Sequence, residues 1–151
     1  MPIYNLEFQS QINVPPQVIY DHLSDPHHFV GLQPLLTHVE AVQFSTRDGL
    51  KNVSYTTVEA FRWNGIVLYR NRIRVQTTFT NPPLQFTTTV HSFPNITLHV
   101  EYTFESLNEG TLVKEAMRIY VHSWLAGFVT SEATKAQTAL LTNLKKRLEG
   151  M

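Results

Sequence analysis

Two glutamates in this 151-residue chain stand out because the residues beside them on the same predicted strand face are apolar. Glu59 shares a face with Tyr55 and Phe61, and Glu115 shares one with Met117. A buried carboxylate without a partner is costly and tends to become neutral. It can then bind a ligand hydroxyl or act as a general acid or base, so Glu59 is the candidate catalytic residue. The other interpretation is a structural hydrogen bond, or a bulge that turns the carboxylate outward.

Alternation along the strands supplies the other candidates for a ligand-binding wall, because residues two apart on a strand share a face. The hydroxyl groups of Tyr55, Tyr69 and Tyr102 could orient the polar end of a ligand, or they could belong to core aromatics with satisfied hydroxyls. We expect a ligand to contact Tyr55, Thr57, Glu59, Phe61, Tyr69, Asn71, Thr88, Val100, Tyr102, Glu115, Met117, Trp124 and Phe128.

The seven histidines do not fall at the spacing of a metal site. His27 and His28 are adjacent, so their side chains point in different directions, and no Cys or HExxH-like spacing completes a set of ligands. The sequence also lacks a GxSxG elbow, a Walker loop and a GxGxxG turn. We therefore expect no metal and no other cofactor.

Composition restricts the expected partners. Lys plus Arg and Asp plus Glu number 12 each, which gives no long-range attraction to nucleic acid. No apolar run approaches the ~20 residues that span a bilayer, so stable membrane insertion is not expected. The absence of Cys fits a cytoplasmic protein. Arg70, Arg72 and Arg74 alternate along one strand, which we interpret as a solvated sheet face, with a binding surface for a protein partner or nucleic acid as the alternative.

Turn signals and apolar periodicity predict a strand, two short helices, six strands and a long helix. Asp48-Gly49 and Asn64-Gly65 are hairpin signals, and tight turns require antiparallel neighbours. Pro15-Pro16 and Asp25 mark the starts of the short helices, at 17–24 and 26–30. The predicted strands are 4–12, 36–47, 50–63, 66–80, 84–92, 96–106 and 111–122.

One apolar stripe predicts the long C-terminal helix. Its members are three or four residues apart, and Ser123 is the expected N-cap. We expect the first turns of this helix, with Trp124 and Phe128, to face the short helices near Phe29 and to form a gate with them; ordinary packing is the alternative. The stripe consists of Leu125, Val129, Ala133, Ala136, Leu140, Leu144 and Leu148.

The predicted elements do not fill the space that they enclose. A seven-stranded antiparallel sheet has one apolar face to cover, and here one long helix must cover it. A helix about 10–12 Å across cannot fill the hollow of a strongly curved sheet that wide. The remaining space predicts an internal apolar cavity.

Several short motifs carry a family resemblance: 12–15 (INVP), 18–25 (VIYDHLSD), 34–36 (PLL), 110–113 (GTLV) and 140–150 (LLTNLKKRLEG). In this order and spacing they resemble the START/polyketide-cyclase-like superfamily, which has the helix-grip fold. The resemblance implies an α+β fold in which a curved seven-stranded antiparallel sheet wraps around a long C-terminal helix, with two short helices after the first strand. It also implies a single domain over residues 1–151.

The superfamily holds lipid carriers, hormone receptors, aromatase/cyclases, oxygenase domains and chaperone activators, so the resemblance implies several possible functions. We expect first the carriage or sensing of a small hydrophobic molecule, such as a lipid, a polyketide or an aromatic metabolite. A cyclase- or dehydratase-like enzyme that uses Glu59 is the second hypothesis, and a protein-interaction module is the third. We expect a monomer or a weak homodimer.

Overall fold

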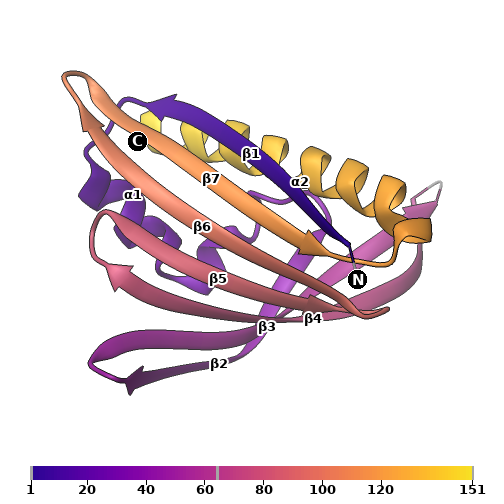
Figure 1. Cartoon of the computed structure of the whole chain (residues 1–151). Coiled ribbons are helices and arrows are strands. Elements are labelled where there is room, and N and C mark those ends of the chain that lie inside the picture. Colours follow the sequence, from indigo (N-terminus) through magenta and orange to yellow (C-terminus); the bar gives the residue numbers. More distant parts are fainter. Residues whose placement is uncertain (1, 64, 151) are drawn as a thin grey trace.

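The computed structural model describes residues 2–63 and 65–150, apart from the side chains of 61–63, 68 and 69. Figure 1 shows the elements in their chain order. They are β1 (Ile3–Ile12), α1 (Pro16–Leu23), the 3-10 helix η1 (Pro26–Phe29), β2 (Leu36–Arg47), β3 (Leu50–Trp63), β4 (Ile66–Asn81), β5 (Gln85–Ser92), β6 (Ile96–Leu107), β7 (Gly110–Tyr120) and α2 (Ser123–Glu149). The predicted strand boundaries agree with these within two residues.

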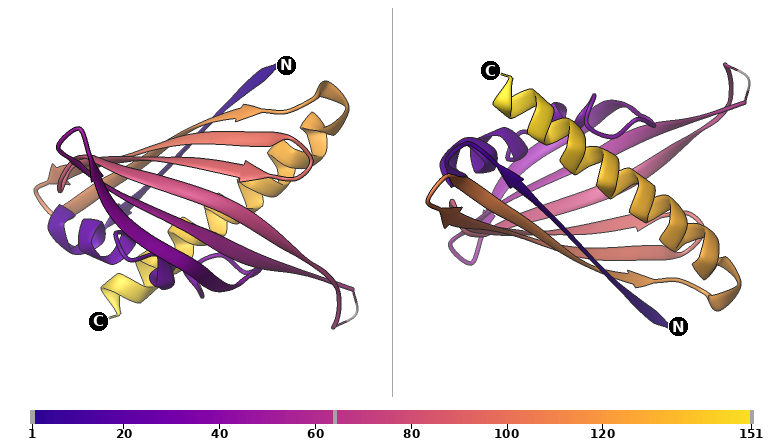
Figure 2. Two further views of the ribbon diagram at one scale, coloured as in Figure 1. Left: turned by 90° about the horizontal axis from the view of Figure 1, so that it is seen from below. Right: turned by 90° about the horizontal axis from the view of Figure 1, so that it is seen from above.

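The strands form one antiparallel sheet in the order β1-β7-β6-β5-β4-β3-β2. From β2 to β7, each strand forms a hairpin with the next one along the chain. β1 pairs with β7, so that Tyr4 lies opposite Ile119. Figure 2 shows α2 lying diagonally across one face of the curved sheet. This is the α+β helix-grip fold that the sequence predicted.

The hairpin predicted at Asp48-Gly49 is confirmed by the backbone. Asp48 has φ 52° and Gly49 has φ 78°, and two consecutive positive φ values are the geometry of a type I′ turn. This turn connects β2 to β3 at their ends, where Arg47 pairs with Leu50. The second predicted hairpin includes Asn64, which lies outside the described residues.

Aromatic rings fill one end of the sheet, near the β4–β5 and β6–β7 turns. Tyr20 of α1 packs edge-on against Phe86 and Phe104, with ring centroids 5.7 Å apart in both pairs. Phe79 lies 6.0 Å from Phe86, and Tyr102 lies 4.7 Å from it. Phe86 and Phe104 are almost completely buried. The Tyr20 ring of α1 therefore closes this end of the sheet, and we call these five rings the aromatic cluster.

The apolar stripe of α2 faces the sheet as predicted, but its two halves differ in size. Leu140, Leu144 and Leu148 in the second half are fully or almost fully buried. In the first half the corresponding positions include Ala133 and Ala136, whose short side chains are only partly buried. The second half thus reaches into the core, and the first half leaves space beneath it.

The predicted N-cap of α2 is wrong. Ser123 is the first residue of the helix, and His122 is the N-cap, with φ −61° and ψ 141°. No side chain caps this helix start. The expected cap at Asp25 is confirmed, because the Asp25 carboxylate accepts a hydrogen bond of 3.0 Å from the backbone N–H of His27.

Candidate functional site

A cavity of about 640 Å³ lies between the concave face of the sheet and the first half of α2. The inward faces of β3 to β7 form its floor, and the segment from 33 to 36 forms part of its rim. Its apolar wall includes Ile73, Val75, Val90, Ile96, Leu98, Val100, Leu125, Val129, Ala133 and Ala136. The predicted hollow is therefore present, on the same face of the sheet as the aromatic rings and adjoining them at Tyr102.

Most of the residues expected to contact a ligand are on the cavity wall. Phe61 and Tyr69 were also predicted, and their side chains lie outside the described residues. Glu115 is not on the wall but directly behind it, with 1% of its surface exposed. The residues that do line the cavity are Tyr55, Thr57, Glu59, Asn71, Thr88, Val100, Tyr102, Met117 and Phe128.

Trp124 does not reach the cavity. Its side chain is 77% exposed and is not part of the cavity wall. In a helix, residues three or four apart share a face, so Trp124 lies to one side of the stripe that contains Leu125 and Val129. Phe128, four residues later, shares this side of the helix with Trp124, and it lines the cavity although it is 62% exposed. Trp124 is one turn nearer the start of the helix and is not on the wall.

Glu59 is the carboxylate that the sheet contributes to the cavity wall. Burial raises the pKa of its carboxyl group above the ordinary value, and the nearby charge of Glu132 raises it further. Glu132 also lines the cavity, from α2, and lies 3.6 Å from the exposed Lys135 ammonium group. Glu59 therefore combines access to the cavity with a raised affinity for a proton, as a general acid or a hydrogen-bond donor requires.

Hydroxyl groups on three adjacent strands form a buried polar strip, of which Tyr55 and Thr88 line the cavity and Thr77 does not. The hydroxyl oxygens of Thr77 and Thr88 are 2.9 Å apart, and Thr77 also hydrogen-bonds the Tyr55 hydroxyl. Burial raises the pKa of Tyr55 to about 12, against the smaller opposing effect of the Thr77 bond. The Tyr55 hydroxyl is thus neutral, and it already has a partner within the protein.

A second polar group lies where the aromatic cluster meets the cavity. One atom of the Gln137 amide lies 2.7 Å from one carboxyl oxygen of Glu115 and 3.2 Å from the other. Burial raises the pKa of Glu115 to about 8. The amide can therefore present its oxygen to the protonated carboxyl group, or rotate to present its nitrogen to the ionised form. Either arrangement satisfies the buried carboxyl group.

Tyr102 belongs to the same polar group. Tyr102 on β6 lies directly opposite Glu115 on β7. Side chains at such opposed positions of antiparallel strands are close enough to touch. Burial raises the pKa of Tyr102 well above its ordinary value, and the charges of Glu115 and Tyr55 add to the effect. Sequence reasoning found Tyr102 and Glu115 but missed Gln137. The signal was available, because Gln137 is a polar residue four positions after Ala133 of the apolar stripe.

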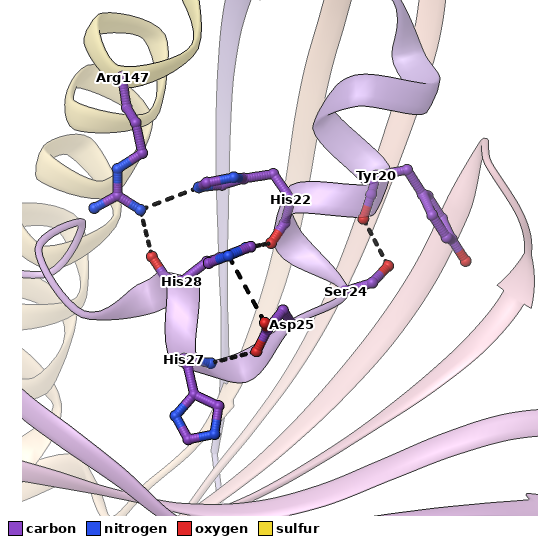
Figure 3. Close-up of polar contacts among 7 residues, drawn as sticks. All are labelled: Tyr20, His22, Ser24, Asp25, His27, His28 and Arg147. Atoms are coloured by element: carbon purple, nitrogen blue, oxygen red, sulfur yellow. Dashed lines mark hydrogen bonds and ion pairs between the residues drawn. The ribbon is translucent and has the colours of Figure 1, made fainter. Parts of the chain in front are cut away.

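The short helices are fixed by the C-terminal end of α2, as Figure 3 shows. Arg147 donates hydrogen bonds to the carbonyl oxygens of His28, at 2.6 Å, and Val30, at 3.0 Å. Asn143 donates to the carbonyl oxygen of Leu32, at 2.9 Å. These hydrogen bonds come from the end of α2 opposite to the turns that were expected to form a gate with this segment. Phe29 and Phe128 both line the cavity, and the gate stays a prediction.

The imidazole of His22 is part of the same contact. Arg147 lies 3.0 Å from Nε2 of His22, and an arginine can only donate, so this nitrogen is the unprotonated acceptor. The His22 and His28 rings stack 4.2 Å apart. Burial lowers the pKa of His22, the charges of His28 and Arg147 lower it further, and Asp25 acts in the opposite direction. A neutral His22 therefore belongs to the intact contact.

Two negative findings apply to the described part of the chain. Within it, no group of three or more His, Cys, Asp or Glu side chains is arranged to hold a metal ion. No helix among the described residues is long and apolar enough to cross a membrane.

The three arginines of β4, Arg70, Arg72 and Arg74, are exposed, and Arg72 donates a hydrogen bond of 2.9 Å to the Glu40 carboxylate.

The structure is similar to several solved proteins. A START superfamily protein from Mycobacterium smegmatis is 13% identical, with a TM-score of 0.76 and 97% of each chain covered. The Zhui aromatase/cyclase from Streptomyces sp. R1128 is 12% identical, with a TM-score of 0.67, 97% of this chain covered and 96% of that one. At this level of identity the likeness concerns the fold alone.

A third similar structure is the di-domain ARO/CYC BexL from the BE-7585A biosynthetic pathway. It is 12% identical, with a TM-score of 0.71, and the match covers 95% of this chain but only 49% of BexL. The chain thus spans about half the length of that protein. No curated protein is significantly similar to the chain by sequence.

The family is decided by the sequence itself. Residues 5–149 match the family described as polyketide cyclase / dehydrase and lipid transport. This range contains every strand pairing of the sheet except the outermost residues of β1, together with all of α2. The chain therefore belongs to the polyketide cyclase / dehydrase and lipid transport family.

Proposed function

We propose that the chain binds a small hydrophobic molecule in the cavity between the sheet and the first half of α2, as a carrier or a sensor. The observation that carries this proposal is the cavity of about 640 Å³ with a mostly apolar wall. Natural cores are close-packed, so a hollow of this size is not an ordinary packing defect. Its volume falls in the range of ligand-binding cavities, roughly 300–1,000 Å³.

Burial of the ligand supplies the affinity. Each Å² of apolar surface removed from water contributes about 25 cal/mol, so a ligand that buries roughly 200 Å² gains about 5 kcal/mol before the costs of association. The few polar groups on the wall then set the orientation of the ligand.

Native mass spectrometry of the freshly purified protein tests the proposal directly, since a co-purifying molecule is expected. Titration with the uncharged dye Nile red gives a second test. Ala133→Phe places a ring in the cavity and should reduce dye affinity by about tenfold or more. Thr138→Phe is the matched control, because Thr138 is exposed on the same helix and should leave dye binding unchanged. Equal binding by both variants would contradict a site in the cavity.

Catalysis at Glu59 is the second candidate function. It is favoured by the position of this carboxyl group on the cavity wall and by the raised pKa that burial gives it. If the chain is a cyclase- or dehydratase-like enzyme, Glu59→Gln should abolish conversion of the co-purified molecule and leave its binding nearly unchanged. In a carrier the same variant changes ligand preference, and no conversion is seen with either protein.

A further inference from the structure

The inner end of the cavity differs in polarity from the rest of its wall. Tyr102, Glu115 and Gln137 come from β6, β7 and α2, and their exposed fractions are 5%, 1% and 8%. Tyr102 and Gln137 line the cavity, and Glu115 lies behind them. Three polar side chains buried this deeply, in one place, are costly unless each is hydrogen-bonded.

The hydrogen bonds within this group leave the Tyr102 hydroxyl able to donate to a ligand. The Glu115 carboxyl group and the Gln137 amide pair with each other at 2.7 and 3.2 Å. Within the described part of the chain no hydrogen bond is assigned to the Tyr102 hydroxyl, whereas the Tyr55 hydroxyl is bonded to Thr77. Among the described residues, the Tyr102 hydroxyl is therefore a polar group at the inner end of the cavity without a hydrogen bond to the protein.

The charges on the wall determine which polar group a ligand can bring. Among the described residues, the charged side chains that line the cavity are Glu59, Glu132 and Lys135. Lys135 is exposed and lies 3.6 Å from Glu132, so its charge is at the mouth and already has a partner. A ligand carboxylate at the inner end would be buried beside Glu115 without a cation, which is strongly disfavoured.

We propose that Tyr102, with the Glu115–Gln137 pair beside it, is the polar anchor of the cavity and selects uncharged hydrophobic ligands that carry a hydroxyl or carbonyl oxygen over carboxylates. This inference rests on the proposed binding function. The Tyr102 hydroxyl donates to the ligand oxygen, and the protonated Glu115 carboxyl group keeps the inner end uncharged near neutral pH. The apolar wall holds the rest of the molecule.

Probes with the same hydrocarbon chain test the selection. Displacement of Nile red by dodecanol, dodecanoate and dodecylamine, each below its aggregation concentration, gives three affinities. At about pH 7.4 dodecanol should bind at least about tenfold more tightly than dodecanoate. Because an acid can bind in its protonated form, dodecanoate should gain up to about tenfold per unit as the pH falls toward its pKa, while dodecanol should not change.

Tyr102→Phe removes only the hydroxyl and should weaken dodecanol binding by roughly three- to tenfold. Because Nile red itself carries a carbonyl oxygen, its affinity is measured by direct titration of each variant before the displacement by dodecanol is evaluated. Tyr55→Phe is the matched control, because the hydroxyl that it removes is bonded to Thr77, and it should weaken dodecanol much less. Thermal melting of both variants verifies that they are folded.

The possible results separate the two proposals. If dodecanol binds tightly but dodecanoate binds equally well, the proposal that Tyr102 is the anchor fails and the binding function stands. The same conclusion follows if dodecylamine binds better than dodecanol. Equal losses in Tyr102→Phe and Tyr55→Phe would also overturn the anchor. If neither Nile red nor dodecanol binds to the unmodified protein, both proposals fail.

Discussion

From Leu140 onward α2 presents leucines to the sheet, whereas from Leu125 to Ala136 it presents mainly small or medium side chains. The leucines are buried in a core that also contains Phe86 and Phe104. The smaller side chains line a cavity of about 640 Å³. One helix on one sheet therefore builds a packed end and a hollow end, and the difference lies in side-chain volume rather than in backbone architecture.

The comparison implies a division of labour between stability and binding. A side chain that touches atoms on all sides contributes transfer free energy and dispersion contacts, whereas a side chain that borders a hollow has already lost part of both. We therefore expect substitutions at the packed end to change the free energy of unfolding. Substitutions at the hollow end should mainly change ligand affinity.

The largest expected effect on stability comes from removing a ring at the packed end. Phe86→Ala should lower the free energy of unfolding by about 3–5 kcal/mol, because the ring is almost completely buried. Leu98→Ala on the cavity wall should cost less than about 2 kcal/mol, since Leu98 is only partly buried. Urea denaturation of both variants measures the difference. Equal losses would mean that the two ends are packed alike.

A pH-dependent loss of stability is expected where the two ends meet. Burial raises the pKa of Glu115 from 4.5 to about 8, so the folded protein binds this proton more tightly than the unfolded chain does. The stabilisation is complete below the unfolded value and is lost as the pH rises toward about 8, with a total on the order of a few kcal/mol.

Glu115→Gln removes this titration. Unfolding free energies measured between about pH 5 and 9 should fall with pH in the unmodified protein, and the fall should be smaller in the variant. Other titrating groups cancel in the difference between the two proteins. Parallel curves over the whole range would show that Glu115 does not retain its proton on folding.

A smaller loss is expected from the contact that joins the packed end to the cavity rim. Arg147→Met should lower the free energy of unfolding by about 1–2 kcal/mol, because it removes the donors to the carbonyl oxygens of His28 and Val30. Hydrogen exchange of the 26–34 segment should accelerate more than that of the sheet. Lys146→Met is the control, since Lys146 is exposed, and exchange at the same rate in both variants would argue against the contact.

The smallest expected effect is the pH dependence of the same contact. The pKa of His22 is lowered by burial first and then by His28 and Arg147, so the unfolded chain binds this proton more tightly. Stability from this group is present above the unfolded value of 6.5 and is lost as the pH falls below it, opposite in sign to the effect of Glu115.

In the unmodified protein the melting temperature should fall as the pH is lowered from about 7.5 to 5.5. In His22→Gln this fall should be smaller, because glutamine cannot take up a proton. His27→Gln is the matched control, since His27 is exposed on the same segment. An equal effect of the two substitutions would assign the pH dependence to another group.

Much of the fold could be predicted because its signals are local. Asp48 and Gly49 form the predicted turn because a type I′ turn needs two positive φ values in succession. Strand alternation placed Tyr55, Tyr102 and Met117 on the inward face, where the cavity wall includes them. The failures at Trp124 and Ser123 both concern the first turn of α2, namely how far the cavity extends along the helix and where the helix begins, and its packing against the sheet decides both.

The sequence by itself determined the order of the elements, the face that each strand buries and the apolar stripe of α2, because each follows from a period of two or 3.6 residues within one segment. Only the tertiary structure decided that Gln137 meets Glu115 and that Arg147 reaches the carbonyl oxygens of His28 and Val30. These pairs join segments that no periodicity relates. Their contacts depend on the curvature of the sheet and on where the helix crosses it.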